Sequence, residues 1–317
     1  MKIGIDLGGT HTAAAFVSGD GKIIDRVSIP TNSSGGSRAV TNGLLRVCDM
    51  LIMGTAAKET VPLSIGVGIP GTVNAETGEI VFTPNLPLSG VNVVRAIKKK
   101  YECPIYIGND ANCAALGESI VGSAKGAKSA ILVTLGSGVG GGIIYNGHLH
   151  SGISGAAGEI GHMVIIAGGR ECGCGRRGCW EVYASATGLV RTVNEFIGPH
   201  SGSMLLDLCG GSLEKINGRM VFDAHRAGDS AARLAVEVYI EHLAAGLVNI
   251  INIFEPEIVC IGGGLANAWD CISEPLIAAV DAEKFTRFSV DAPATRIVQA
   301  ELGNDAGVIG AAMLGEL

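Results

Sequence analysis

Two segments of the chain repeat one pattern, and this repeat constrains the fold more than any other feature of the sequence. Each has an apolar run, a glycine-rich turn and a second apolar run; the first begins at Lys2 and the second at Ala130. Aligned without gaps at a constant offset, the segments match at Leu7 and Leu135, at Gly8 and Gly136, and at Gly19 and Gly147. Each predicts a strand, a tight turn and a second strand. We interpret the repeat as an internal duplication, which predicts two lobes built on one plan.

Further apolar runs alternate with helical patterns along the rest of the chain. The runs that end in glycine are typical of buried strands and cover 64–71, 105–110 and 258–264. Helical patterns cover 36–53, 91–100, 111–121 and 230–254, the last with Asp229 as N-cap and Pro256 as a stop. Strands that alternate with helices predict the α/β class with mixed sheets. We expect a first lobe of residues 1–115, completed by a C-terminal helix at 305–317, and a second lobe of residues 116–304 that contains a cysteine-rich segment at 159–181.

The composition excludes several kinds of protein. Hydrophobic residues make up 47% and charged residues 17%, which excludes extensive disorder. A net charge of −7 and only 4% aromatic residues disfavour nucleic-acid binding and acidic membranes. The chain opens without the apolar region of a signal peptide, and we expect no membrane partner. The odd number of cysteines, nine, is not a disulfide framework, so we expect a cytoplasmic protein.

The first glycine turn, Asp6-Leu-Gly8-Gly9-Thr10, follows an apolar strand. Glycines allow backbone N–H groups to approach a phosphate closely, and an aspartate at the strand end can hold Mg²⁺ directly or through water. The same residues also suit an ordinary hairpin turn, and this segment alone does not decide between the two.

Two later glycine segments are also candidate nucleotide loops. Gly136, Gly138 and Gly141 match the G-x-G-x-x-G pattern of dinucleotide-binding proteins, but that pattern requires a helix next and a strand is predicted here. A phosphate-binding hairpin like the first turn therefore fits better than an NAD site. Gly263 and Gly264 follow a buried strand, where they would let an adenine or ribose lie on the backbone or would begin a helix.

Asn109 and Asp110 lie between an apolar strand and a predicted helix. The helix N-terminus stabilises a carboxylate as the anion, which leaves Asp110 able to accept a proton from a hydroxyl group. Asn109 offers both a donor and an acceptor to a sugar hydroxyl. A plain helix cap is the alternative for this pair.

The segment from Glu159 to Glu181 carries the most specific pattern. It supplies one imidazole and three thiols, which form the closed tetrahedral set of a structural zinc site: His162, Cys172, Cys174 and Cys179. Four protein ligands leave no open position, so we do not expect zinc to activate water. The two glutamates bracket the site, and two rigidly held carboxylates suit the recognition of neighbouring sugar hydroxyls.

Together these residues resemble the ROK family (repressors, open reading frames and sugar kinases) from Asp6 to the C-terminal GNDAGVIGAA motif. The resemblance implies a two-lobed, actin-like, hexokinase-type fold of duplicated ribonuclease H-like design, with ATP in a cleft between the lobes. It implies Asp110 as the catalytic base. It implies sugar contacts from Asn85, Asn109, Asp110, Glu159, His162 and Glu181, with one nitrogen of His162 on zinc. The nucleotide would contact Asp6, Gly8, Gly9, Thr10, Thr134, Gly136, Ser137, Gly138, Gly263 and Gly264.

The resemblance also implies a reaction: transfer of a phosphoryl group from ATP, with Mg²⁺, to the 6-hydroxyl of a hexose, with glucose expected first. N-acetylmannosamine, allose or fructose is the alternative substrate, and a sugar sensor without catalysis is the alternative class. Repressors of the family carry a DNA-binding domain before the first glycine turn; here the strand begins at residue 2, so we expect none. Many relatives have lysine at His11 and threonine at Ser137. Relatives are often dimers or tetramers, so a homo-oligomer is expected.

Overall fold

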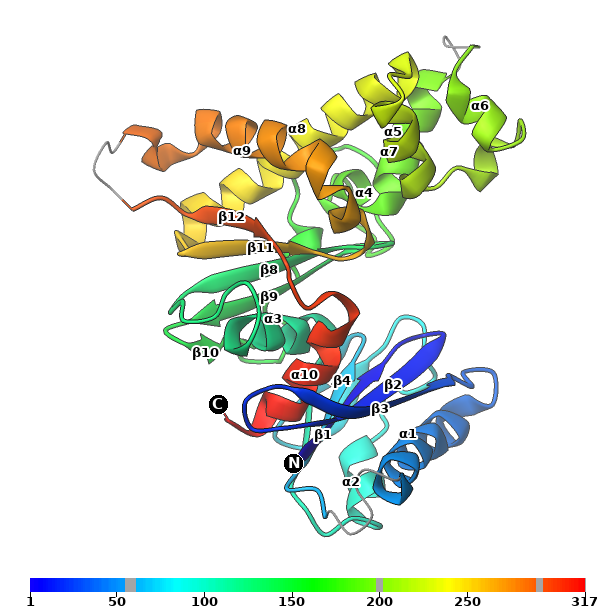
Figure 1. Cartoon of the computed structure of the whole chain (residues 1–317), viewed down its shortest axis with the longest axis vertical. Coiled ribbons are helices and arrows are strands. Elements are labelled where there is room, and N and C mark those ends of the chain that lie inside the picture. Colours follow the sequence, from blue (N-terminus) through cyan, green and yellow to red (C-terminus); the bar gives the residue numbers. More distant parts are fainter. Residues whose placement is uncertain (55–60, 198–201, 289–292, 317) are drawn as a thin grey trace. The chain divides into compact units, whose positions relative to one another are not determined.

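Two five-stranded sheets with the same connectivity form the framework of the structure, a computed structural model (Figure 1). The first sheet has the order β3 (Ile23–Pro30), β2 (His11–Val17), β1 (Lys2–Leu7), β4 (Ile65–Ile69) and β7 (Ile105–Asn109). The second has the order β10 (His148–Leu149), β9 (Val139–Tyr145), β8 (Ala130–Leu135), β11 (Ile258–Gly262) and β12 (Arg296–Gln299). β1 and β8 begin and end at aligned positions of the repeat, as do β2 and β9. The predicted duplication and the α/β class are therefore confirmed.

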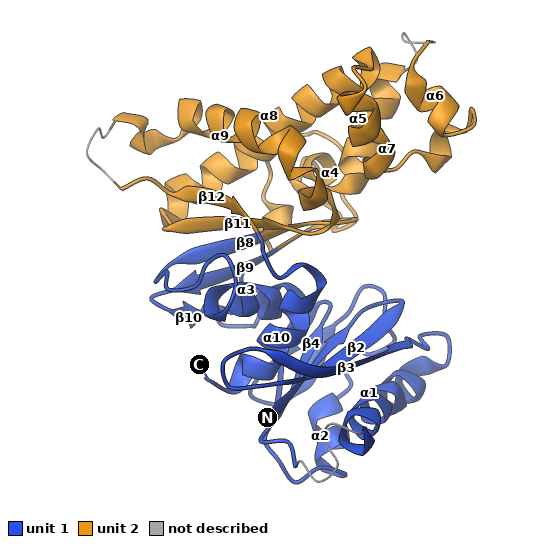
Figure 2. Cartoon of the chain, viewed as in Figure 1, with its two compact units in different colours: residues 1–132, 141–158, 300–317 blue, residues 133–140, 159–299 orange. Residues whose placement is uncertain are grey.

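Residues 1–54, 61–197, 202–288 and 293–316 are described by the structure, and the chain divides into two compact units (Figure 2). Unit 1 comprises residues 1–132, 141–158 and 300–317, and unit 2 comprises residues 133–140 and 159–299. This division places 116–132 and 141–158 with unit 1, whereas we expected them in the second lobe. The two units are defined by how densely their residues contact one another, which does not test where a lobe begins. The predicted lobe boundary after residue 115 therefore stays a prediction.

In unit 1, alternate residues of the central strands face two different layers of helices. Ile3 and Ile5 face the core beneath helix α1 (Gly36–Met53), which ends where the sequence predicted. On the other face, a Cβ at Gly4 or Gly66 would overlap backbone atoms of helix α10 (Ala306–Met313). The glycines therefore allow α10 to lie directly on the sheet, where its apolar residues are buried.

The other elements of unit 1 connect these layers. They are β5 (Thr72–Asn74), β6 (Glu79–Phe82), α2 (Val93–Lys98), α3 (Asp110–Ile120) and the short 3-10 helices η5 (Gly303–Asp305) and η6 (Leu314–Glu316). Helix α2 is shorter than the predicted 91–100, and it starts at Val93 because Asn92 caps it by accepting a hydrogen bond from the Arg95 N–H. Helix α3 packs against α10, and both helices belong to unit 1. The predicted completion of the first lobe by the C-terminal helix stays a prediction.

Unit 2 is built around the long helix α8 (Ser230–Phe254). Asp229 caps it by accepting from the Ala232 N–H, and Glu255 ends it in the left-handed conformation just before Pro256, as the sequence predicted. Among the described residues, α8 is the only helix long and apolar enough to cross a membrane, but 61% of its most apolar window is buried, so it is a core helix. The remaining elements are η1 (Ile160–His162), α4 (Glu181–Ala184), α5 (Ala186–Ile197), α6 (Met204–Leu208), η2 (Leu213–Lys215), α7 (Gly218–Arg226), η3 (Gly264–Ala268), α9 (Trp269–Glu283) and η4 (Phe285–Phe288).

A buried carboxylate anchors the chain where it re-enters unit 1. Glu118 is 1% exposed and accepts hydrogen bonds from the N–H and hydroxyl groups of Ser123 and from the N–H of Leu302 at 2.8 Å. We expect Glu118→Ala to lower the free energy of unfolding by about 3 kcal/mol, because it removes a buried acceptor that serves several partly buried donors. Urea denaturation measures this loss. Glu301→Ala, which removes an exposed carboxylate nearby, is the control and should change stability by less than about 0.5 kcal/mol.

Candidate functional site

Two predicted acidic residues lie close together in unit 1. Asp6 is the next-to-last residue of β1, and Asp110 begins α3. Burial, and then the nearby Asp110 carboxylate, raises the pKa of Asp6 to about 6. Burial also raises the pKa of Asp110, although the Ala111 N–H, which donates to its Oδ1 at 2.9 Å, opposes the shift. Two half-buried carboxylates of this kind form a hard, oxygen-rich and negatively charged site, which suits a divalent cation such as Mg²⁺.

The junction of β7 and α3 positions Asp110. Asn109 is the N-cap: its side-chain oxygen accepts from the Asn112 N–H at 3.0 Å, and its amide group donates to the Gly71 carbonyl at 3.0 Å. The cap alternative is therefore correct for Asn109. Its amide retains one N–H and one lone pair, which are sufficient for the predicted sugar contact. Asp110 lies in the first helical turn, where the helix dipole favours the anion.

The first glycine turn is a hairpin braced from the neighbouring strand. The Gly8 N–H donates to the His11 carbonyl at 2.9 Å, while the Thr31 hydroxyl donates to the Gly8 carbonyl at 2.8 Å. The Thr31 N–H also donates to the Thr10 carbonyl. A cavity of about 290 Å³ that the sequence did not predict lies beside this brace, lined by Thr12, Ile29, Pro30, Thr31, Asn32, Ala39, Val40, Asn42, Gly43 and Arg46.

Unit 2 brings the other two glycine segments together. The second turn joins β8 to β9, and the Gly136 N–H donates to the Gly138 carbonyl at 3.0 Å. Gly263 has a φ of +82°, and a Cβ on it would lie 2.6 Å from backbone atoms of Leu135, at the start of this turn. The structure places the two segments side by side, and Gly263 begins the 3-10 helix at Gly264–Ala268, as the helix-start alternative for this segment predicted. The predicted nucleotide contacts of both segments stay predictions. Because β9 follows the turn, the dinucleotide-binding alternative lacks its helix.

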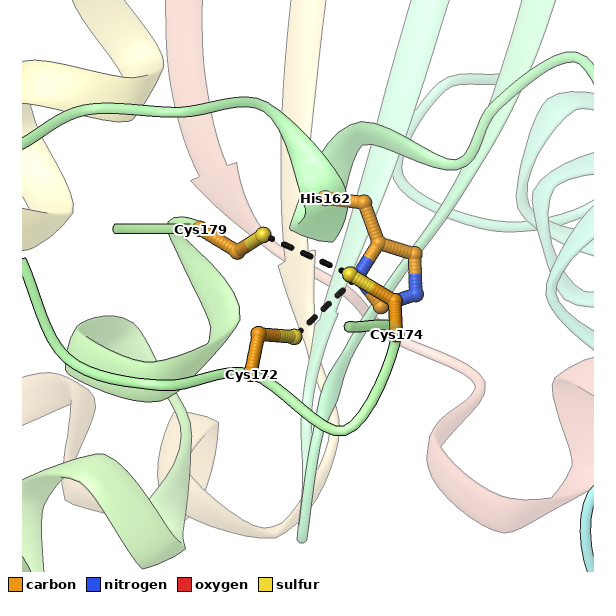
Figure 3. A group of neighbouring side chains, drawn as sticks. All are labelled: His162, Cys172, Cys174 and Cys179. Atoms are coloured by element: carbon orange, nitrogen blue, oxygen red, sulfur yellow. Dashed lines mark hydrogen bonds between the residues drawn. The ribbon is translucent and has the colours of Figure 1, made fainter. Parts of the chain in front are cut away.

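The four predicted zinc ligands converge in unit 2, as Figure 3 shows. Their ligand atoms all lie within 4.8 Å of one another. The Cys172 sulfur is 3.6 Å from Nδ1 of His162, and the sulfurs of Cys174 and Cys179 are 3.7 Å apart. A tetrahedral zinc ion with bonds of about 2.0–2.3 Å requires separations of roughly 3.5–3.8 Å between its ligands. The cluster therefore has the dimensions of a zinc site.

The pKa values of the cluster thiols are shifted in different directions by their surroundings. Burial raises the pKa of Cys172 and Cys179, whereas a hydrogen bond from the Arg176 backbone lowers the pKa of the exposed Cys174. The lowered pKa of Cys174 favours the thiolate form that binds a metal ion, and a bound cation would displace the protons of the other two thiols. The other imidazole nitrogen of His162, Nε2, lies 3.9 Å from the Glu159 carboxylate. His162 thus presents one nitrogen to the cluster and one to a predicted sugar-binding residue.

Two other predicted sugar contacts have different surroundings. Glu181 begins α4, and its carboxylate accepts a hydrogen bond from the Val139 N–H at 3.1 Å, beside the second glycine turn. Asn85 is exposed in the loop between β6 and α2, where the Thr83 hydroxyl donates to the Leu86 carbonyl. Asp110 and Asn85 belong to unit 1, whereas Glu159, His162 and Glu181 belong to unit 2. The predicted common sugar site stays a prediction.

A second cavity adjoins the third glycine segment and was not found from the sequence. It has a volume of about 300 Å³, and its lining includes Phe222 and Leu265 as apolar residues and Asn267 as a polar one. The other lining residues are Gly218, Arg219, Asp223, Arg226, Gly264 and Ala268. Arg226 is held by two hydrogen bonds to Asp270 at 2.8 and 2.9 Å. Only Gly264 carried a sequence signal, because α7 reads as an ordinary amphipathic helix.

This chain is an α/β protein with two five-stranded sheets of the same connectivity. It carries glycine turns, an acidic pair and a Cys₃His cluster. The model of the ROK family matches residues 2–316, so the chain belongs to the ROK family.

Relatives and a solved structure agree with this assignment over nearly the whole chain. The chain is 37% identical to a glucokinase of Halalkalibacterium halodurans, over 98% of this chain and 94% of that protein. It is 35% identical to a glucokinase of Thermotoga maritima, with coverages of 98% and 96%. The crystal structure of a ROK family glucokinase from Streptomyces griseus, in complex with glucose and AMPPNP, matches with a TM-score of 0.80, 31% identity and coverages of 99% and 98%.

Proposed function

We propose that this protein is a glucokinase, an ATP- and Mg²⁺-dependent kinase that phosphorylates the 6-hydroxyl of glucose. The observation that carries the proposal is the full-length likeness to the Streptomyces griseus glucokinase, whose structure holds glucose and an ATP analogue together. The named relatives have the same activity and match from end to end. The acidic pair and the glycine turns supply residues suited to this chemistry.

In the proposed mechanism, Asp110 accepts the proton of the sugar 6-hydroxyl as its oxygen attacks the γ-phosphoryl group in line. Glu159, His162 and Glu181 hold the other sugar hydroxyls, with Asn109 and Asn85 as further contacts. Backbone N–H groups of the first two glycine turns stabilise the charge that develops on the phosphoryl oxygens. The base is held at the start of a helix, so its carboxylate is oriented before the sugar binds.

Two metal ions belong to this proposal. Asp6 would hold Mg²⁺ with the phosphates, directly or through water, and Mg²⁺ neutralises phosphate charge when bound. His162, Cys172, Cys174 and Cys179 would hold a structural Zn²⁺, which fixes the ends of the sugar-binding segment 159–181. We place the adenine in the cavity beside Gly264, because its apolar residues suit an aromatic base and Asn267 can pair with the base edge.

A panel of hexoses tests the proposal. Purified protein with ATP and Mg²⁺ should produce ADP with glucose, with a higher kcat/KM than with N-acetylmannosamine, allose, fructose or mannose at equal concentration. A preference for another hexose would keep the kinase and change its substrate. Sugar binding without ADP formation would instead indicate a sensor, and polyphosphate in place of ATP tests the phosphoryl donor.

We further propose that the protein works in the cytoplasm. All nine cysteines are free thiols, as expected in a reducing compartment. Its homo-oligomeric state stays a prediction, which light scattering of the purified protein measures directly.

A further inference from the structure

The backbone of Glu181 is fixed by the residue before it. Trp180 is fully buried, and its indole N–H donates to the His242 carbonyl at 2.9 Å. Its backbone N–H donates to the Met163 carbonyl at 2.7 Å, and a Cβ on Gly246 would overlap its ring. Because Trp180 is packed closely on α8, the backbone of the next residue, Glu181, is held in one position at the start of α4.

The two carboxylate oxygens of Glu181 face different parts of unit 2. Oε2 accepts from the Val139 N–H at 3.1 Å, and a Cβ on Gly138 would overlap this oxygen. Oε1 lies 3.9 Å from the sulfur of Cys172. The side chain therefore lies between a predicted zinc ligand and the second glycine turn, and Gly138 leaves the space it needs.

Two residues that follow α4, Ala186 and Thr187, donate hydrogen bonds to carbonyl groups of the second glycine turn. The Ala186 N–H donates to the Gly136 carbonyl at 2.8 Å, and the Thr187 hydroxyl donates to the Ser137 carbonyl at 2.9 Å. In a trans peptide the C=O of one residue and the N–H of the next point in opposite directions. Fixing these two carbonyls therefore aims the N–H groups of Ser137 and Gly138 away from α5, as a phosphate-binding turn requires.

We propose that Glu181 is a positioning residue that couples the Cys₃His cluster to nucleotide binding. With Ala186 and Thr187 it forms a clasp, residues 181–187, which holds the second glycine turn in the form that binds the phosphates of a nucleoside triphosphate. Because the clasp begins two residues after Cys179, its position depends on an intact cluster. Loss of zinc thus weakens nucleotide binding as well as sugar binding. This inference rests on the proposed function only in taking the turn at 136–138 as a phosphate site.

Binding of AMPPNP with Mg²⁺, measured by calorimetry without sugar, tests the clasp. Glu181→Ala should raise the Kd for AMPPNP about tenfold, because it removes one charged hydrogen-bond acceptor, while elemental analysis still finds about one zinc per chain. Glu181→Gln retains an oxygen for the Val139 N–H, so its Kd should stay within about threefold of the wild type. Glu171→Ala is the matched control: it removes an exposed carboxylate of the same segment, and its Kd should not change.

Removing zinc from the wild type with a chelator should raise the AMPPNP Kd by a similar factor, and removing it from Glu181→Ala should add little, because both changes release one clasp. Thr187→Val tests the other end of the clasp without approaching the cluster, and it should raise the Kd about threefold. If Glu181→Ala loses its zinc, Thr187→Val still tests whether the clasp supports nucleotide binding.

Unchanged AMPPNP affinity in Thr187→Val and in a zinc-loaded Glu181→Ala would overturn the proposal. Loss of glucose affinity alone in Glu181→Ala would have the same consequence, since the residue would then be only a sugar contact. A wild type that binds neither AMPPNP nor ATP would instead contradict the proposed function, so the two failures are distinguishable.

Discussion

Replacing Asp110 by asparagine should lower kcat for glucose phosphorylation by about 10²–10⁴-fold, while glucose still binds. The amide keeps the oxygen that accepts the Ala111 N–H, and Asn109 still caps the helix. The local structure should therefore persist, but the side chain can no longer accept a proton from the sugar hydroxyl. A coupled assay for ADP measures kcat, and calorimetry with glucose measures binding.

The same substitution should leave thermal stability unchanged or raise it. Burial raises the pKa of Asp110 above its unfolded value, so the ionised carboxylate reduces the stability of the folded state at pH 7. A neutral amide of the same shape removes this cost, as is common at catalytic positions. Glu76→Gln, which neutralises an exposed carboxylate in the turn between β5 and β6, is the control and should change neither kcat nor melting temperature. A nearly normal kcat in Asp110→Asn would exclude Asp110 as the base, and loss of glucose affinity would make it a binding residue.

The elements that could be predicted from the sequence are those whose signals are local. Helix α8 begins directly after the capping Asp229 and ends two residues before Pro256, as these two residues predicted. The register of the duplicated strands followed from apolar residues and from glycines at a tight turn, since both depend on the backbone of the segment itself. The zinc ligands were predictable for the same reason: three of the four lie within one short loop.

Contacts between distant segments could not be predicted in this way. The cavity beside Gly264 is formed by α7 and η3, and no motif near Phe222 in the sequence indicates that α7 lines it. Glycines inside β1 and β4 weaken a strand in isolation, and their purpose is visible only once α10 lies on them. Glu118 likewise reads as one acid on a helix face until its bond to Leu302 is known.

Two predicted sugar contacts also have structural roles that their residue types did not reveal. Asn109 caps α3 and donates to Gly71, while Glu181 accepts from Val139. An amide or a carboxylate has several donor or acceptor positions, so one side chain can support its own site and still contact a ligand. Substitutions here will therefore change binding and local structure together, which is why paired variants such as Glu181→Ala and Glu181→Gln are needed.

Cys174→Ala should remove most of the zinc from the protein and weaken glucose binding by about 10–100-fold. Of the three cluster cysteines, Cys174 is the exposed one and Cys172 and Cys179 are buried, so its replacement disturbs the metal site without opening a cavity in the core. Without the fourth ligand, the ends of segment 159–181 are no longer held together, and Glu159 loses the fixed imidazole beside it. Elemental analysis measures the zinc, and calorimetry with glucose measures the affinity.

Cys271→Ala provides the matched comparison, because it removes a thiol from α9 of the same unit, outside the cluster. It should keep about one zinc per chain and bind glucose like the wild type. A metal-free Cys174→Ala protein with normal glucose affinity would show that the loop holds its shape through backbone hydrogen bonds alone, such as that from Cys172 to Arg176 at 2.9 Å. We expect the opposite, because the four ligand atoms lie within 4.8 Å of one another and come from both ends of the segment, so one bound cation would join them.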